Sequence, residues 1–293
     1  LGEAVLAGSF VTPGLTLMAW DGVSRLRLNS GAVLTTTASI GGLNTAYTPT
    51  AAIQPATLVL AGGTLNGSIS FLEHSRLEVA GQYSTLGASL SGTLSELRLA
   101  SGATLAMPGS TLSIGRVDNA GTLSLAAGGR LSLAGQVDNA GVFTIGGSGN
   151  TGLAAVYLTA DTTWSGNGST VLTDADYSYI GGTGRLTVGS GHTLRGAGTI
   201  ATSVTNLGQV TATGRFTVNA GSGSSFDNSA GQIRVADGGT VVVSLGALSG
   251  GSLQGTGRRV MGIGHRVYKV RDPRAEPLMK NVLQMVEATG ERQ

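Results

Sequence analysis

The chain has 293 residues, of which 49 are glycine, 12% are charged and 4% are aromatic. The absence of cysteine excludes a disulfide framework and a thiolate metal site, and no apolar run reaches the roughly 18 residues that a membrane-spanning helix needs. The net charge of +2 is the sum of −2 over residues 1–257 and +4 over residues 258–293, so the long first part lacks the positive charge that nucleic-acid binding requires.

The first ten residues, LGEAVLAGSF, lack both a starting methionine and the basic segment that opens a secretory signal peptide. We therefore expect the N-terminus to be a cut end of a longer protein. Across residues 1–257, glycine together with abundant serine, threonine and asparagine favours turns and a hydroxyl-rich exterior, and disfavours helix.

A five-residue pattern recurs along this first part: serine or glycine, then arginine, then leucine or phenylalanine, any residue, and leucine or valine. Successive side chains of a strand point to opposite faces, so the two apolar side chains of the pattern would point inward and the arginine outward. The pattern predicts strands at residues 24–28, 75–79, 129–133, 184–188 and 214–218.

A second repeat, VDNAG, begins at Val117 and again at Val137, each time before alternating apolar residues, and looser copies follow further along the chain. The spacing of 20 residues predicts that Asn119 and Asn139 stack as a ladder of side-chain amides. Asp118 and Asp138 should then lie one coil apart on the same edge. We interpret these two acids as turn residues rather than catalytic groups.

Two all-β architectures compete for these strands: a sandwich or barrel, and a solenoid. A sandwich uses non-identical strands and needs no fixed spacing, whereas a degenerate but persistent repeat near 20 residues is typical of stacked coils. A single coil buries too few aliphatic side chains to offset the entropy of ordering its backbone, so stability must come from stacking. We predict a parallel β-helix of about a dozen coils as one domain over residues 1–257.

The phrases DNAGTLSL and GRLTVGSGHTLRGAGTI, from Asp118 and Gly184 respectively, resemble passenger domains of bacterial autotransporters and related secreted adhesins. The resemblance implies a right-handed parallel β-helix at the cell surface or outside the cell, with a structural or adhesive role and a glycan or protein of the host or cell surface as partner. If the terminal coils expose strand edges, edge-to-edge self-association follows as a further expectation.

A polysaccharide-degrading β-helix is an alternative, but its clustered acids are not evident in this sequence. Asp174 and Asp176 form the closest acidic pair, and we interpret them as a polar loop, with calcium ligation as the alternative. His74 and His192 have no partner at metal-ligand spacing and are expected to be surface or turn residues. No metal site and no cofactor is predicted. Of the two tryptophans, Trp20 and Trp164, each could be a carbohydrate platform but is better explained by packing at an irregular coil.

The C-terminal part, residues 258–293, has a different composition and contains both lysines of the chain. Its segment RRVMGIGHRVYKVRDPRA resembles the citrate synthase signature, in which Gly-x-Gly-His leads to Asp-Pro-Arg. The resemblance implies that His265 polarises the oxaloacetate carbonyl and that Arg274 pairs with a substrate carboxylate, with acetyl-CoA as co-substrate. A short helix from about Leu278, with a stop at Gly290, should follow this segment.

Condensation of acetyl-CoA with oxaloacetate needs groups that this fragment does not supply. The family also uses an earlier histidine and an aspartate base, and the chain has only three residues after Gly290. We therefore expect a passenger-type rod without a complete active site, rather than an active acyltransferase. The rod of an exported protein and a fragment of cytoplasmic origin belong to different compartments, so we interpret their junction as a spurious fusion.

Overall fold

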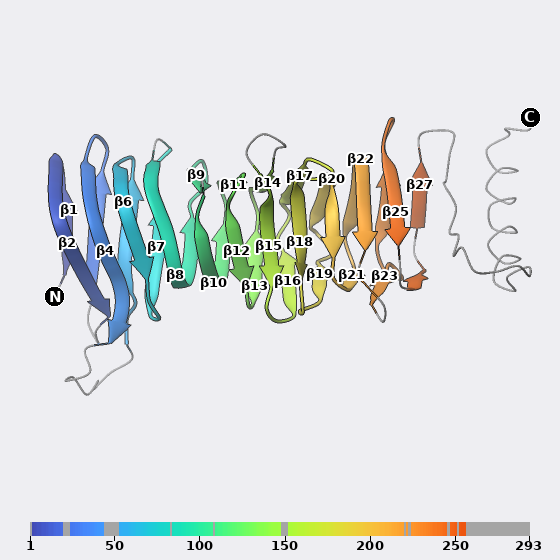
Figure 1. Ribbon diagram of the computed structural model, residues 1–293, viewed down its shortest axis with the longest axis horizontal. Helices are drawn as coiled ribbons and strands as arrows, with labels where there is room; N and C mark the ends of the chain where they lie inside the picture. The colour runs from blue at the N-terminus through green and yellow to red at the C-terminus, as the bar shows by residue number, and fades with distance from the viewer. Residues whose placement is uncertain are drawn as a thin grey trace, which may run out of the picture. The chain divides into compact units, whose positions relative to one another are not determined.

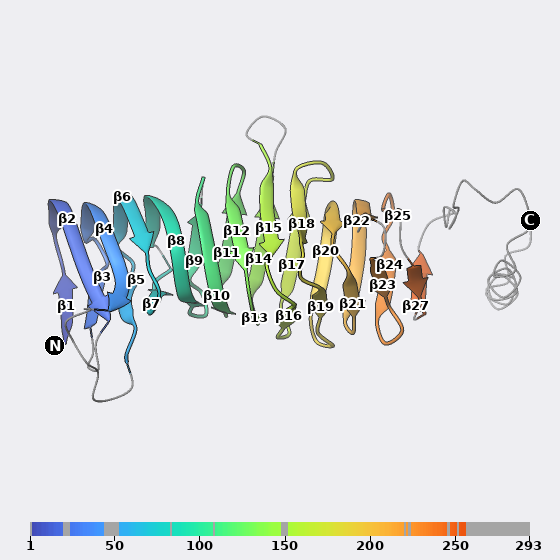
Figure 2. The same cartoon turned by 60° about the horizontal axis from the view of Figure 1, so that its bottom comes forward.

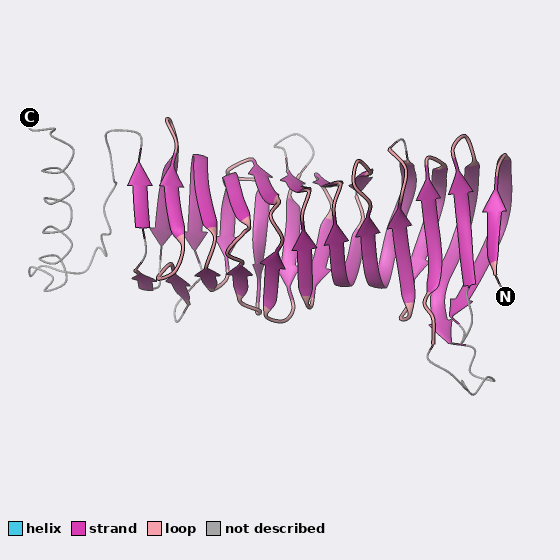
Figure 3. Ribbon diagram, turned by 180° about the vertical axis from the view of Figure 1, so that it is seen from behind, coloured by secondary structure: helices cyan, strands magenta, loops and turns pink. Residues whose placement is uncertain are grey.

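The computed structural model describes residues 2–19, 24–43, 53–82, 84–107, 109–147, 152–219, 221, 224–244, 247–250 and 252–255. These residues belong to the first of the two units of the chain, Leu1–Val260. They form 27 strands and no helix (Figures 1 and 3), which confirms the predicted all-β class for this part of the chain. The helix predicted from Leu278 lies outside the described residues.

The strands pair in parallel along three faces of one continuous stack. The first face contains twelve strands in series: β1 (Glu3–Leu6), β3 (Ser24–Asn29), β5 (Ala56–Ala61), β7 (Ser75–Val79), β8 (Thr85–Leu99), β10 (Thr111–Asn119), β13 (Gln136–Asn139), β16 (Thr162–Ser165), β19 (Leu186–Val188), β21 (Val204–Asn206), β23 (Ser225–Asp227) and β26 (Ala247–Ser249).

The second face begins with long strands that bend, and it shares some of them with its neighbours. It contains β2 (Ser9–Ala19), β4 (Val33–Leu43), β6 (Thr64–Phe71), β8, β10, β12 (Arg130–Leu133), β15 (Ala154–Leu158), β18 (Ser178–Gly182), β20 (Thr193–Ala201), β22 (Gln209–Asn219) and β25 (Thr240–Ser244). The third face contains β9 (Thr104–Met107), β11 (Thr122–Ala126), β14 (Val142–Gly146), β17 (Ser169–Thr173), β20, β22, β24 (Gln232–Val235) and β27 (Ser252–Gly255).

Each face advances by one strand per turn, so the described residues form a parallel β-solenoid. The turns succeed one another in chain order along the stack (Figures 1 and 2). This confirms the solenoid and excludes the sandwich, because a sandwich would pair antiparallel strands. The right-handed sense expected from the resemblance stays a prediction.

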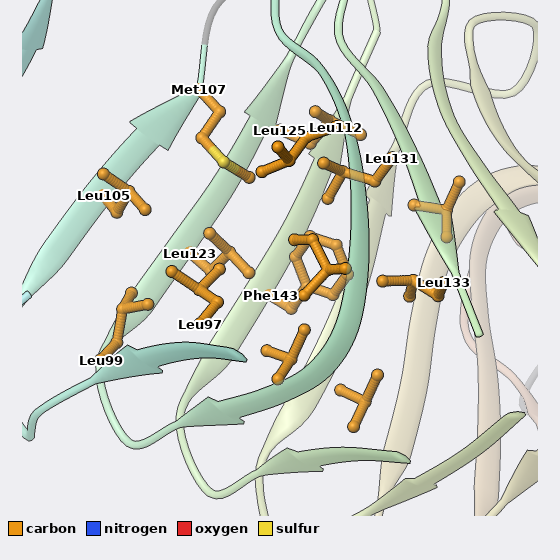
Figure 4. Packing of buried hydrophobic residues seen from close by; sticks show 14 of the residues in the cluster. Leu97, Leu99, Leu105, Met107, Leu112, Leu123, Leu125, Leu131, Leu133 and Phe143 are labelled. Carbon is orange, nitrogen blue, oxygen red and sulfur yellow. The ribbon is translucent and has the colours of Figure 1, made fainter. Parts of the chain in front are cut away.

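The interior consists of aliphatic rows that run along the stack, one residue per turn. Leu28, Leu60, Val79 and Leu99 are paired in succession on the first face, and each is at most 3% exposed. Figure 4 shows leucines from neighbouring turns meeting Phe143 in the same interior. The arginine-containing pattern has the predicted alternation: its apolar residues are buried in β3 and β7, and the residues between them are half-exposed.

The long strands bend at glycines that sit close to the turn below. Gly67 in β6 and Gly196 in β20 have φ values of 103° and 116°, a left-handed region that other residues rarely adopt. A Cβ atom at these positions would also collide with the carbonyl oxygens of Thr36 and Leu172, respectively. Glycine is therefore required at these bends for both reasons.

Asparagine replaces the aliphatic side chain where the row through Leu99 continues. Asn119 and Asn139 face each other across β10 and β13, and the Asn119 Nδ2 donates to the Asn139 Oδ1 at 2.8 Å. The Asn139 Nδ2 donates in turn to the Ser169 carbonyl oxygen at 3.0 Å, and the Asn119 Oδ1 accepts from the Gly121 N–H at 3.1 Å. The predicted amide ladder is confirmed. Its hydrogen bonds satisfy backbone N–H and C=O groups near the turns that would otherwise be buried without partners.

A second ladder joins Asn206 to Asn228 in the looser copies of the repeat. The Asn206 Nδ2 donates to the Asn228 Oδ1 at 2.7 Å, and the Asn206 Oδ1 accepts from the Gly208 N–H. Both asparagines are at most 1% exposed. The same turn chemistry therefore recurs in turns whose sequences have diverged.

Replacing Asn139 with alanine is expected to lower the free energy of unfolding by about 2 to 3 kcal/mol, because it leaves the Ser169 carbonyl without its donor and removes one acceptor of Asn119. Urea unfolding followed by circular dichroism measures the change. The neighbouring Asp138→Ala is the control, with an expected change within about 0.5 kcal/mol, because Asp138 faces outward. Equal losses in the two variants would contradict a structural role for the ladder.

The first described turn leaves part of the interior row open to solvent. Phe10 of β2 is opposite Leu34 of β4, yet Phe10 is 44% exposed and Leu34 only 2%. Val5 and Val11 on β1 and β2 are also exposed. The self-association expected from such edges stays a prediction.

Candidate functional site

The two residues that the sequence assigns to a substrate site lie outside the described part of the chain. His265 and Arg274 both belong to residues 256–293, which the structure does not describe. Their predicted roles toward oxaloacetate therefore stay predictions.

The acidic pair in the loop between β17 and β18 has the geometry of a turn. The Asp174 Oδ1 accepts from the backbone N–H groups of Asp176 and Tyr177 at 2.9 and 3.1 Å, which is an Asx turn. Asp176 is exposed and pairs with Arg215 of β22. The described residues contain no group of three His, Cys, Asp or Glu side chains that could hold a metal ion. The polar-loop interpretation of Asp174 and Asp176 accounts for these contacts.

The two aspartates of the VDNAG repeats lie in register on the first face, as predicted. Asp118 of β10 is opposite Asp138 of β13, and both side chains face outward. Their interpretation as turn residues is wrong, because both lie within strands and the hydrogen bonds of the turn come from Asn119 instead. The alternation of the strand explains this, since adjacent residues point to opposite sides.

The two described histidines occupy contrasting environments. His74 is exposed in the turn before β7, with a φ of 58°. His192 also follows a turn, but it is 1% exposed, so the expectation that it lies at the surface is wrong. Trp20 lies outside the described residues, whereas Trp164 is fully buried and is therefore a packing residue, not a carbohydrate platform.

His192 is held in the interior by neighbours that carry no charge. Its Nε2 lies 3.0 Å from the Thr170 Oγ1, and its ring meets Trp164 edge-on, with ring centroids 6.2 Å apart. The Nδ1 is buried without a hydrogen-bonding partner of good geometry among the described residues. Burial lowers the pKa of His192 to about 4, and the backbone of Gly166 opposes this shift only in part. The neutral ring is a structural element rather than an acid or base catalyst.

A ladder of arginine and glutamate side chains runs along the outer side of the first face. Arg76, Glu96 and Arg116 are in register on β7, β8 and β10, which lie side by side in Figures 1 and 2. A parallel row contains Glu78 and Arg98. Charges therefore alternate from one strand to the next, and also along each strand between residues two positions apart. Cross-strand pairing favours opposite charges at facing positions.

Glu96 is the centre of this ladder. Its carboxylate accepts from the Arg76 Nε at 2.7 Å and from the Arg98 Nε at 2.7 Å, and the Arg116 Nε lies 4.0 Å away. Burial acts to raise the pKa of Glu96, but the hydrogen bonds from Arg98 and Arg76 outweigh it and hold the pKa below its usual value. Glu96 is therefore charged at neutral pH and fixes the positions of the guanidinium groups.

An ion pair between β3 and β7 holds one member of the ladder in place. The Arg25 Nη2 of β3 lies 2.6 Å from the Glu78 Oε2 of β7, so the pair passes over the strand between them, β5. Thr57 and Val59 of β5 are also buried, although they flank Leu58 and so occupy the outward positions of the strand. The pair therefore fixes Glu78 on one side of the Glu96 cluster.

A hollow of about 460 Å³ opens beside this cluster. We call it the arginine groove; its lining includes His74, Arg76, Ser95, Glu96, Arg98 and Arg116. The lining carries three arginines and one carboxylate, and these four side chains have a net charge of +2. The arginine groove is the candidate functional site of the described residues.

Sequence reasoning assigned the arginines only an outward direction and did not find the groove. A signal was available, because Arg76, Glu96 and Arg116 are spaced by 20 residues, the same interval that separates the VDNAG copies. At one turn per interval, this spacing places alternating charges in one row. The ion pair over β5 has no such signal, since it spans 53 residues.

Comparison with known proteins gives one match, at the C-terminal end. The family model of the citrate synthase C-terminal domain matches residues 248–293. Within that range the structure describes residues 248–250 and 252–255, which include the last two residues of β26 and all of β27. No curated protein and no solved structure matches the chain. Within the described part, no helix is long and apolar enough to cross a membrane.

Proposed function

We propose that residues 1–257 form the rod of a surface-exposed structural or adhesin-type protein of the autotransporter passenger class. The observation that carries the proposal is the uninterrupted parallel stack, in which twelve strands follow one another on a single face. Such a stack buries only a narrow interior and presents long, regular outer faces. That form suits display and contact along an extended partner more than enclosure of a small substrate.

The outer faces support this proposal through their hydroxyl ladders. Thr104 is opposite Thr122, and Ser113 is opposite Ser132, with all four side chains directed outward. Side chains of one kind therefore repeat at the strand spacing of about 4.8 Å. Repeating polar groups can contact a polymer at several points, which raises the overall affinity of individually weak contacts.

Binding of the full chain to an array of glycans and host-surface proteins tests the proposal. We expect saturable binding to a subset of the array, abolished when the chain is unfolded beforehand. A folded chain, verified by circular dichroism, that binds no member of the array would contradict the adhesive role.

A second candidate, citrate synthase activity, has its own support in the family match to residues 248–293 and in the GIGH and DPR segments around His265 and Arg274. The assay is release of thiol from acetyl-CoA in the presence of oxaloacetate. Release that depends on both substrates and is lost in His265→Ala would establish the activity. A folded chain that releases no thiol would remove this candidate.

A further inference from the structure

We propose that the arginine groove binds the anionic groups, carboxylate or sulfate, of an acidic polysaccharide. This inference rests on the proposed function, since it names the ligand class of the same rod. The groups that would contact the ligand are the guanidinium groups of Arg98 and Arg116, with Ser95 and His74 also in the lining of the hollow.

In this cluster the side chains of Arg98 and Arg116 are more exposed to solvent than those of the glutamates. The side chains of Arg98 and Arg116 are each 47% exposed, whereas those of Glu96 and Glu78 are 13% and 18% exposed. Glu78 is further occupied by Arg25 and Arg76. An approaching ligand therefore meets guanidinium groups first, although the carboxylates beneath them are charged.

The two exposed guanidinium groups have N–H donors that make no hydrogen bond to the described residues. Among the described residues, Arg98 uses only its Nε, toward Glu96, and Arg116 comes no closer than 4.0 Å to an acid. Each guanidinium has five N–H donors in a planar fork that matches the two oxygens of a carboxylate or sulfate. Glu96 has already fixed the Arg98 side chain, so binding costs less conformational entropy than it would with a free arginine.

The form of the site favours a chain of sugars over a single small anion. The hollow is open along the outer face, and neighbouring strands repeat their side chains about every 4.8 Å. Ser95 and His74 add hydrogen-bonding groups that suit sugar hydroxyl groups. Asp118, next to Arg98 across the strands, is an outward carboxylate that would oppose an anion, so its removal should change the affinity in the opposite direction to the removal of an arginine.

The experiment measures binding of the full chain to polygalacturonate, dextran sulfate and neutral dextran by biolayer interferometry at two salt concentrations. We expect the two anionic polymers to bind, the neutral polymer not to bind, and affinity to fall as salt rises. The double variant Arg98→Gln/Arg116→Gln should weaken binding by at least about tenfold, the loss of a charge-assisted pair. Asp118→Asn should strengthen it, which a folding defect could not do.

Arg195→Gln is the matched control, because it removes an exposed arginine from the third face, away from the groove. It should leave affinity unchanged within about twofold, since it does not touch the site. Equal affinity in the wild type and the double variant, or equal losses in the double variant and Arg195→Gln, would overturn the groove as the site. Binding to other members of the glycan array without binding to either anionic polymer would overturn this inference and leave the proposed function standing.

Discussion

Trp164→Ala is expected to lower the free energy of unfolding by about 3 to 5 kcal/mol, among the largest effects of any single substitution in the described residues. Trp164 is fully buried, and its ring packs against Phe143 with ring centroids 6.0 Å apart. In the row that contains Phe143 and Leu194, the residue between them is Thr170, which is small and polar. The Trp164 side chain fills the interior at this level. Truncation therefore leaves a cavity that its neighbours cannot fill.

The control for this prediction is Trp164→Phe. The Trp164 Nε1 has no hydrogen-bonding partner among the described residues, so phenylalanine removes volume without breaking a described hydrogen bond, and the expected loss is about 1 to 2 kcal/mol. Urea unfolding measures the global change, and hydrogen exchange at β13, β16 and β19 measures local opening, because each turn of a solenoid contacts only its neighbours. Equal losses for the two variants would contradict a role based on filled volume.

Acid is expected to destabilise the solenoid through His192. The pKa of His192 is about 4 in the folded chain and about 6.5 when unfolded, so protonation favours the unfolded state. The stabilisation from the neutral ring is fully present above about pH 6.5 and is lost as the pH falls toward 4, with a total of up to about 3 kcal/mol. Free energies of unfolding measured between pH 7.5 and 4 test this dependence.

Two variants separate this effect from the titration of carboxylates. His192→Gln keeps a polar group near Thr170 but cannot be protonated, so its stability should fall less with acid than that of the wild type. His74→Asn removes an exposed histidine at a position where asparagine tolerates the positive φ, and should retain the pH dependence of the wild type. Parallel pH profiles for the wild type and His192→Gln would show that His192 does not cause the loss.

Local pattern was sufficient to predict the strands and their stacking. The alternation in Ser75 to Val79 sets the buried and half-exposed sides of β7, and the 20-residue interval sets which residues of successive turns meet. The Asn119–Asn139 ladder followed directly from that interval. Each of these features depends on residues within one turn of each other, so the sequence carries their signal.

The errors and omissions have a common physical cause. Whether His192 is buried depends on the side chains that surround it from other turns, Trp164 and Thr170, and not on its own neighbours in sequence. The assignment of turn chemistry to Asp118 failed because pairing with the next turn extends β10 to Asn119, which keeps Asp118 within the strand. Predicting such features requires the register of several turns at once.

The sequence by itself determined the β-solenoid that the described residues form, because hydrophobic alternation and a fixed repeat mean that the aliphatic side chains can be buried only by stacking successive turns. Only the tertiary structure decided where charges gather. At the arginine groove Glu96 holds Arg98, and beside it the Arg25–Glu78 pair passes over β5, so these contacts join residues from several turns. Their free energy depends on distance and burial, which the order of residues does not contain.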